Sequence, residues 1–260
     1  MSSALSREQL NELINAFPNK SIFLAGCYVK EFNYDYCLMD VFVYPSEEKL
    51  FYVDRESKIA VRGVSEKQHF LKEEVKILYD PSFSAYQLFL EKEAYMKNVL
   101  EKGLKESLNF LSNLKLLGPT AIYAAAGRLI EPAVVLSESS LSPSHVFRQI
   151  NKKNHEYLNV IFESLQIDSN MGEILKARAE ALTNFLPKDE AKLFFLKIDS
   201  LIKNKKELEA SVYFFHQLSK LSVSSLKDLS QYLKFGQVEE KTKKRLLELI
   251  AELTKELNDL

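Results

Sequence analysis

The chain has 260 residues, 46% of them hydrophobic and 27% charged, and its formal net charge is -1. This composition is typical of a soluble globular protein with one large or two medium domains. A net charge so close to zero excludes recruitment of nucleic acid by the field of the whole molecule. No stretch approaches the ~20 apolar residues that span a bilayer. Two cysteines do not make a disulfide framework, so we expect a cytoplasmic protein with reduced thiols and no membrane partner; the alternative is a bridge between Cys27 and Cys37.

The first third of the chain predicts a small unit of mixed strands and helices. Ser6 and Gln9 form a capping box that begins a helix ending near Phe17. Short β-branched and aromatic runs follow, separated by turn residues, and the third run is expected to form a hairpin with the second. The expected elements are a helix over 6–17, strands over 22–25, 39–44, 49–53 and 57–64, a short helix over 66–74, and a strand over 75–79.

From Ser84 onward the sequence has long stretches of helical periodicity with few breaks. Gly118-Pro119 and Ser142-Pro143 are the clearest helix boundaries, and the Ala-rich run after Pro119 permits close helix packing. We therefore expect an α+β fold: a mixed-sheet domain over 1–82 and an all-α helical bundle over 83–260. The expected helices cover 84–114, 120–136, 144–165, 171–185, 187–203, 207–221, 224–233 and 239–257.

A glycine and a carboxylate lie at the facing ends of the first two expected strands. The first strand runs into Gly26-Cys27, and Asp40 stands at the start of the second. Gly26 has two interpretations: a tight exit from the strand, or a turn that presents backbone amides to a phosphate. Asp40 likewise has two interpretations, a metal or nucleotide ligand and a solvated acid at the end of a strand.

This arrangement resembles the signature of the polymerase-β-type nucleotidyltransferase superfamily, in which a strand ends in Gly-Ser and a later strand opens with Asp-x-Asp. The resemblance covers roughly the first third of the chain and places Gly26 at the glycine, Cys27 at the serine and Asp40 at the second aspartate. It implies that Gly26 and Cys27 meet the nucleotide phosphates. It also implies that Asp40 binds magnesium and that the protein binds a nucleoside triphosphate together with this metal.

The chain departs from that signature at the metal ligands. Leu38 stands at the first aspartate, and the strand that supplies a third carboxylate in the family carries Arg62 instead. Leucine offers no oxygen to magnesium, which binds oxygen ligands in octahedral geometry. Asp35 and Asp54 are the nearby carboxylates that remain to complete a metal site with Asp40. We therefore expect a nucleotidyltransferase-like domain that has lost its chemistry.

Arg148 and His155 form a second candidate site in the helical region. Their Arg-x6-His spacing resembles the motif of HEPN-type ribonucleases. On one continuous helix, a separation of seven residues places both on one face about two turns apart. The pair would then bind or cut RNA, and the alternative is a chance pairing on a solvated helix.

Three hypotheses follow. The first is a catalytically degenerate nucleotidyltransferase homologue that acts as a nucleotide-, protein- or RNA-binding scaffold, self-associating through its helices as a homodimer and needing no cofactor. The second is an active magnesium-dependent nucleotidyltransferase that uses Asp40. The third is an RNA-processing helical domain that uses Arg148 and His155.

Overall fold

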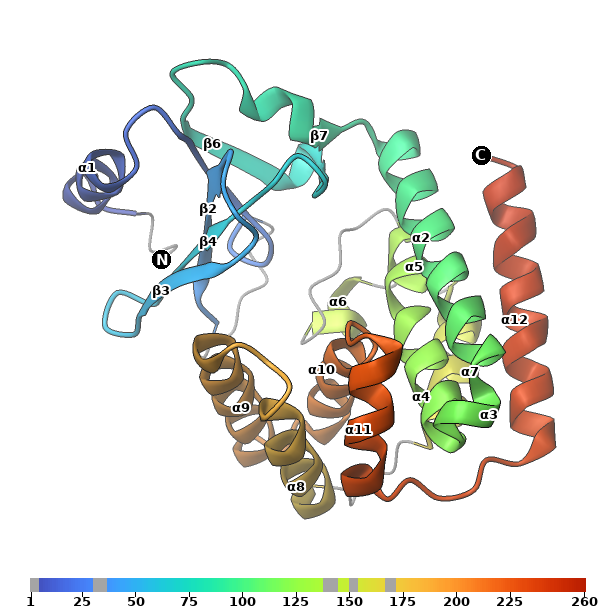
Figure 1. Ribbon diagram of the computed structural model, residues 1–260. Coiled ribbons are helices and arrows are strands. Elements are labelled where there is room, and N and C mark those ends of the chain that lie inside the picture. Colours follow the sequence, from blue (N-terminus) through green and yellow to red (C-terminus); the bar gives the residue numbers. More distant parts are fainter. Residues whose placement is uncertain (1–4, 30–36, 138–144, 150–153, 167–171) are drawn as a thin grey trace. The chain divides into compact units, whose positions relative to one another are not determined.

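The computed structural model describes residues 5–29, 37–137, 145–149, 154–166 and 172–260 (Figure 1). Strands dominate the first part of the chain and helices the second, which confirms the expected α+β class. The chain divides into two compact units, Met1–Tyr95 and Met96–Leu260. The first unit therefore ends later than the expected position 82. Among the described residues, none of the helices combines the length and apolar character that crossing a bilayer requires.

The first unit begins with α1 (Arg7–Ala16), whose N-terminus has the predicted capping box of Ser6 and Gln9. Five strands form the main sheet: β1 (Ser21–Ala25), β2 (Met39–Tyr44), β3 (Leu50–Asp54), β4 (Ile59–Gly63) and β6 (Val75–Tyr79). The expected bounds of β2 and β6 are confirmed. The expected helix over 66–74 is wrong, because β5 (Phe70–Leu71) and the short 3-10 helix η1 (Lys72–Glu74) occupy this stretch.

The strand order in the main sheet is β3-β4-β2-β1-β6 (Figure 1). β1 pairs with β2 in antiparallel register, with Ala25 opposite Asp40, and β2 pairs with β4 in parallel register. The expected hairpin between β2 and β3 is wrong, since β3 pairs with β4 instead. Burial explains this order: β2 and β4 are almost fully buried and take central places, whereas the more exposed β3 lies at the edge.

The two faces of the sheet have separate cores, because successive side chains on a strand point to opposite faces. Met39, Val41 and Val43 pack with Leu13 of α1 on one face. Phe23, Phe42, Ala85 and Leu88 pack together on the other. Burial of Ala85 and Leu88 against this second face also explains why no helix begins at Ser84. The chain there forms the 3-10 helix η2 (Ala85–Leu88) and strand β7 (Phe89–Leu90), which pairs with β5.

The second unit is a bundle of helices in which α4 packs against α7 and α10, and α12 packs against α7. Small residues allow the close approach: a Cβ at Gly127 would lie 2.4 Å from the backbone oxygen of Phe215. The helix expected over 120–136 is interrupted at Leu129, between α4 and α5. The helices are α2 (Lys92–Ser112), α3 (Leu114–Leu117), α4 (Pro119–Arg128), α5 (Ile130–Val135), α6 (Val146–Gln149), α7 (His155–Leu165), α8 (Gly172–Thr183), α9 (Lys188–Lys203), α10 (Glu207–Leu218), α11 (Val223–Leu233) and α12 (Glu240–Asn258).

Candidate functional site

Gly26 and Asp40 are brought together as the sequence predicts. Gly26 follows directly after Ala25, whose register partner across the β1–β2 ladder is Asp40. The backbone at Gly26 has φ 87°, a conformation that glycine adopts without strain. A Cβ at this position would meet no other atom within 4 Å, so conformation, not crowding, requires the glycine.

Asp40 makes an ion pair with Arg62. Asp40 Oδ1 accepts a hydrogen bond from Arg62 Nε at 3.0 Å, and the side chains are 34% and 30% exposed. Both residues lie on the face opposite α1, since their neighbours Met39, Val41 and Val61 belong to the core on the α1 side. A cation already at this carboxylate repels a divalent metal and occupies one of its oxygens.

Asp54 does not join Asp40. Its register partner on β4 is Ile59, which belongs to the core beneath α1, so Asp54 and Asp40 project to opposite faces of the sheet. The Asp54 carboxylate instead accepts hydrogen bonds from the backbone amides of Glu56 and Ser57 in the β3–β4 turn. Hydrogen bonding by Ser57 holds the pKa of Asp54 below its ordinary value. Asp54 is therefore a turn-forming residue, and the third candidate ligand, Asp35, lies outside the described residues.

The sheet face that carries Asp40 is mainly an aromatic core. Phe23 lies fully buried at its centre, with ring centroids of Phe42, Phe70 and Phe89 at 5.5, 5.2 and 5.2 Å. Cys27, at the position of the family serine, is also buried, with 6% of its surface exposed. Polar groups on this face lie at its two margins: Asp40 pairs with Arg62 at one end of β2, and Ser21, which is opposite Tyr44 at the other end, donates a hydrogen bond to Asp80.

Arg148 and His155 lie on two separate helices. Arg148 belongs to α6, whereas His155 is the first residue of α7 and is exposed. The single helix expected over 144–165 is wrong. Asn154 has φ -94° and ψ 5°, outside the helical region, and its buried amide donates a hydrogen bond to Ser137 Oγ at 3.1 Å. Because the two residues do not share one continuous helix, their separation of seven residues no longer places them on one helix face.

A buried charged cluster in the helical unit escaped the sequence analysis. Arg128 of α4 is 4% exposed and makes ion pairs with Glu106 of α2 and, at 3.0 Å, with Glu131 of α5. The other Glu131 oxygen lies 3.8 Å from Nε2 of His216, which is buried in α10. A single arginine inside the apolar run from Tyr123 to Ile130 was the available signal, because a buried arginine requires partners.

His216 is held neutral inside this cluster. Burial, together with the positive charges of Lys220 and Arg128, lowers its pKa well below the ordinary value of 6.5. Glu131 alone would favour the imidazolium, but this carboxylate also neutralises Arg128. Among the described residues, none forms a hydrogen bond with Nδ1 of His216. Protonation of the folded unit is therefore unfavourable.

We predict that the helical unit loses stability as the pH falls below 6.5. Below this pH the unfolded chain protonates His216 while the folded chain does not, so this residue's contribution falls by about 1.4 kcal/mol per pH unit. Urea unfolding followed by circular dichroism from about pH 7 to about pH 5 measures the slope. His216→Gln should make it shallower; equal slopes in the two proteins would contradict the assignment.

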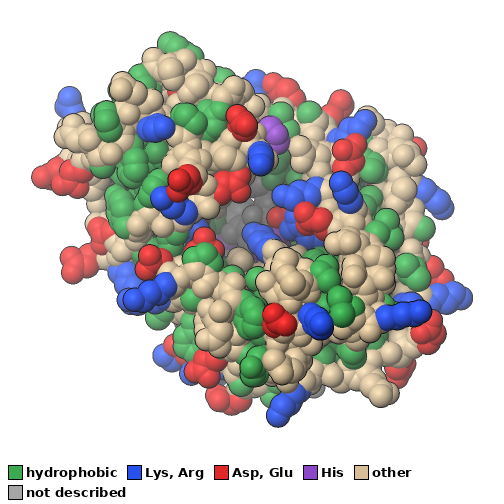
Figure 2. Space-filling view, in the orientation of Figure 1, with side chains coloured by type: hydrophobic (Ala, Val, Ile, Leu, Met, Phe, Trp, Pro, Cys, Tyr) green, Lys and Arg blue, Asp and Glu red, His purple; other side chains and the backbone are tan. Residues whose placement is uncertain are grey.

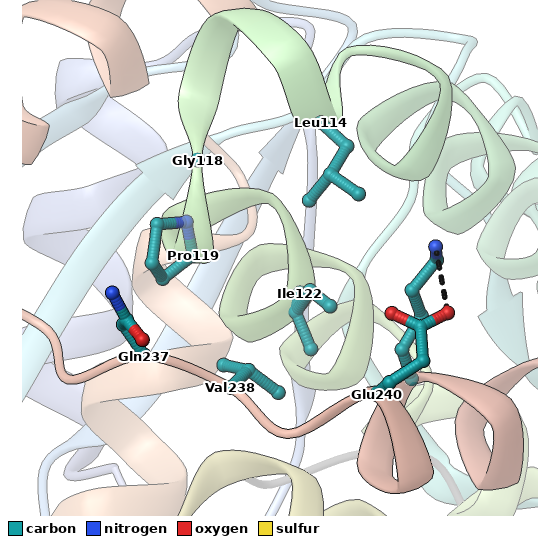
Figure 3. Close-up of a pocket in the computed structure, with 8 residues that line it drawn as sticks. Leu114, Gly118, Pro119, Ile122, Gln237, Val238 and Glu240 are labelled. Atoms are coloured by element: carbon teal, nitrogen blue, oxygen red, sulfur yellow. Dashed lines mark hydrogen bonds and ion pairs between the residues drawn. The ribbon is translucent and has the colours of Figure 1, made fainter.

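A pocket of about 270 Å³ lies at the junction of α3, α4 and α12 (Figure 3). Leu114, Ile122 and Val238 give it an apolar lining, and the ion pair of Lys243 with Glu240 stands at one side. A specific small-molecule site combines such a lining with several converging polar groups. This pocket has the Lys243–Glu240 pair and the amide of Gln237, and the two charged groups neutralise each other, so we assign it no function.

Basic side chains in the helical unit lie beside acidic ones, as the mixed colours of the visible face illustrate (Figure 2). Lys203 pairs with Asp199 at 2.6 Å, and Lys243 with Glu240 at 3.2 Å. These lysines belong to two basic stretches, 203–206 and 241–245, whose other ion pairs are Lys206–Glu209, Lys244–Glu248 and Arg245–Glu163. Such pairing argues against a positively charged surface that follows a phosphate backbone.

Comparison with known proteins adds no family to this picture. Neither a protein-family model nor a curated protein matches the chain. The functional interpretation therefore rests on the geometry of the residues themselves.

Proposed function

We propose that this chain is a catalytically degenerate relative of the polymerase-β-type nucleotidyltransferases that acts as a protein-binding scaffold. The observation that carries the proposal is the Arg62–Asp40 ion pair at 3.0 Å. Phosphoryl transfer of the family type depends on magnesium ions that neutralise the phosphates. Here the one remaining carboxylate of the Asp-x-Asp pattern is neutralised by a side chain of the protein.

Three further features support the loss of chemistry. Leu38 offers no oxygen ligand. Asp54 faces the other side of the sheet. The aromatic core around Phe23 is apolar, whereas a nucleotide site needs polar groups that converge on the phosphates. A magnesium site would therefore require a rearrangement of side chains around Asp40.

The helical unit favours protein over RNA as the partner. Most side chains of its two basic stretches lie beside carboxylates, which reduces the positive charge available to bind phosphates. The separation of Arg148 and His155 onto two helices removes the reason for assigning them to RNA cleavage. We include self-association through the helices in this proposal.

A transfer assay tests the loss of catalysis. The full chain is incubated with magnesium or manganese and each of four α-labelled nucleoside triphosphates, and released pyrophosphate and transferred label are measured. We expect the wild type, Asp40→Asn and Asp54→Asn to be indistinguishable from buffer, because Arg62 occupies the Asp40 carboxylate and Leu38 offers no oxygen ligand to magnesium. Turnover that Asp40→Asn abolishes and Asp54→Asn retains would overturn the proposal.

A further inference from the structure

The two cysteines of the chain lie next to each other in the first unit. Their sulfur atoms are within 4.8 Å of each other, although the two residues are far apart along the sequence, at positions 27 and 37. Both side chains are buried, with 6% and 2% of their surfaces exposed. The thiols are not joined by a disulfide in this structure.

The backbone on either side holds the two sulfur atoms near each other. Cys27 follows the end of β1 by two positions and Cys37 precedes the start of β2 by two, and these strands are paired up to Ala25 and Asp40. Beyond the last ladder pair, the Tyr28 hydroxyl donates a hydrogen bond to the backbone oxygen of Cys37 at 3.0 Å. The approach of the thiols is thus fixed by the sheet and by this bond, not by chance contact of side chains.

We propose that Cys27 and Cys37 form a reversible disulfide when a hydroperoxide oxidises them. A disulfide requires a sulfur–sulfur distance of about 2.05 Å, so the two sulfur atoms must approach each other by less than about 3 Å. Rotation about the Cα–Cβ bonds and a small backbone shift supply such a displacement.

The chemistry balances with one peroxide molecule. One thiolate attacks a peroxide oxygen, the O–O bond breaks, and the products are a sulfenic acid and, after protonation, one water. The second thiolate then attacks the sulfenic sulfur, the S–O bond breaks, and a second water leaves. Two thiols and one hydrogen peroxide thus give one disulfide and two waters. Burial of both sulfur atoms favours a water-sized oxidant over a bulky disulfide such as oxidised glutathione.

The bond would join the ends of the segment that connects Gly26 with Asp40. A cross-link restricts the unfolded chain and the conformations open to the closed segment. Oxidation would therefore cross-link the chain close in sequence to Asp40, which pairs with Arg62. This inference does not depend on the proposed function, because it concerns only the two thiols and their spacing.

Thiol trapping of the folded full-length chain tests the inference. The protein is exposed to hydrogen peroxide, the peroxide is removed with catalase, the chain is denatured in the presence of N-ethylmaleimide so that buried thiols are also labelled, and the product is analysed by intact mass. We expect both thiols to disappear together, a product lighter by two hydrogens with no maleimide attached, and recovery of two maleimide sites after dithiothreitol. Because the chain has only two cysteines, an intramolecular bridge must join Cys27 to Cys37.

Cys27→Ser and Cys37→Ser are the matched controls. Each leaves a single sulfur, so its sulfenic acid persists, reacts with dimedone and proceeds to the sulfinic acid. Wild-type protein that reaches the sulfinic acid as fast as these variants would overturn the proposal. So would a covalent dimer as its main product, or thiols that resist peroxide in the folded chain but not in urea.

Discussion

Arg128→Ala is expected to lower the free energy of unfolding of the helical unit by about 3 kcal/mol. Arg128 is 4% exposed, and its removal leaves Glu106 and Glu131 without their shared cation. Breaking a buried pair costs about 3–5 kcal/mol. The lower end applies because Glu106 and Glu131 are 39% and 25% exposed and keep part of their hydration.

Urea unfolding followed by far-ultraviolet circular dichroism measures this loss. Lys203→Ala is the control, since Lys203 is 72% exposed and pairs with Asp199 one helical turn away. Such surface pairs contribute about 0.5 kcal/mol or less. If both variants lost the same small amount, the charged cluster would not stabilise the bundle.

Phe23→Ala is expected to destabilise the first unit by about 3–5 kcal/mol. Phe23 is fully buried and contacts the rings of Phe42, Phe70 and Phe89, so truncation leaves a cavity at the centre of that sheet face. Because two units can unfold separately, a local measurement is needed. Amide hydrogen exchange of peptides covering β1 and β2 should become faster by about a factor of ten for each 1.4 kcal/mol of lost stability.

Phe83→Ala is the matched control within the same unit. Phe83 is 77% exposed, and its truncation should change the stability by no more than about 0.5 kcal/mol. Equal acceleration of exchange in the two variants would show that the aromatic face is not a packed core. It would also reopen that face as a binding site.

Local signals in the sequence predicted local structure. The capping box of Ser6 and Gln9 and the bounds of β2 and β6 follow from short-range patterns and are confirmed. The partner of β3 could not be predicted in this way, because the parallel pairing of β2 with β4 depends on which strands are buried on both faces. The prediction that a helix begins at Ser84 was wrong for the same reason. Its apolar residues read as helical, but the sheet draws Ala85 and Leu88 into its core.

In the candidate site, too, local contacts agreed with the sequence-based expectation and tertiary contacts were missed. The approach of Gly26 to Asp40 agrees with the resemblance, which implies that both belong to one site, and it depends only on two consecutive strands and their connection. The hydrogen bond of Arg62 to Asp40 depends on a third strand, and the cluster of Arg128 with Glu131 and His216 depends on the packing of three helices. A sequence pattern does not contain these tertiary contacts.

The most direct test of the central claim is calorimetric titration of the wild type with ATP, GTP, CTP and UTP, with and without magnesium. Asp40→Ala tests the candidate ligand, and Asp54→Ala is the control for loss of a carboxylate on the opposite face. We predict no magnesium-dependent binding in any of the three proteins, because Arg62 holds Asp40. Magnesium-dependent binding that Asp40→Ala removes and Asp54→Ala retains would contradict the claim and establish a surviving metal–nucleotide site.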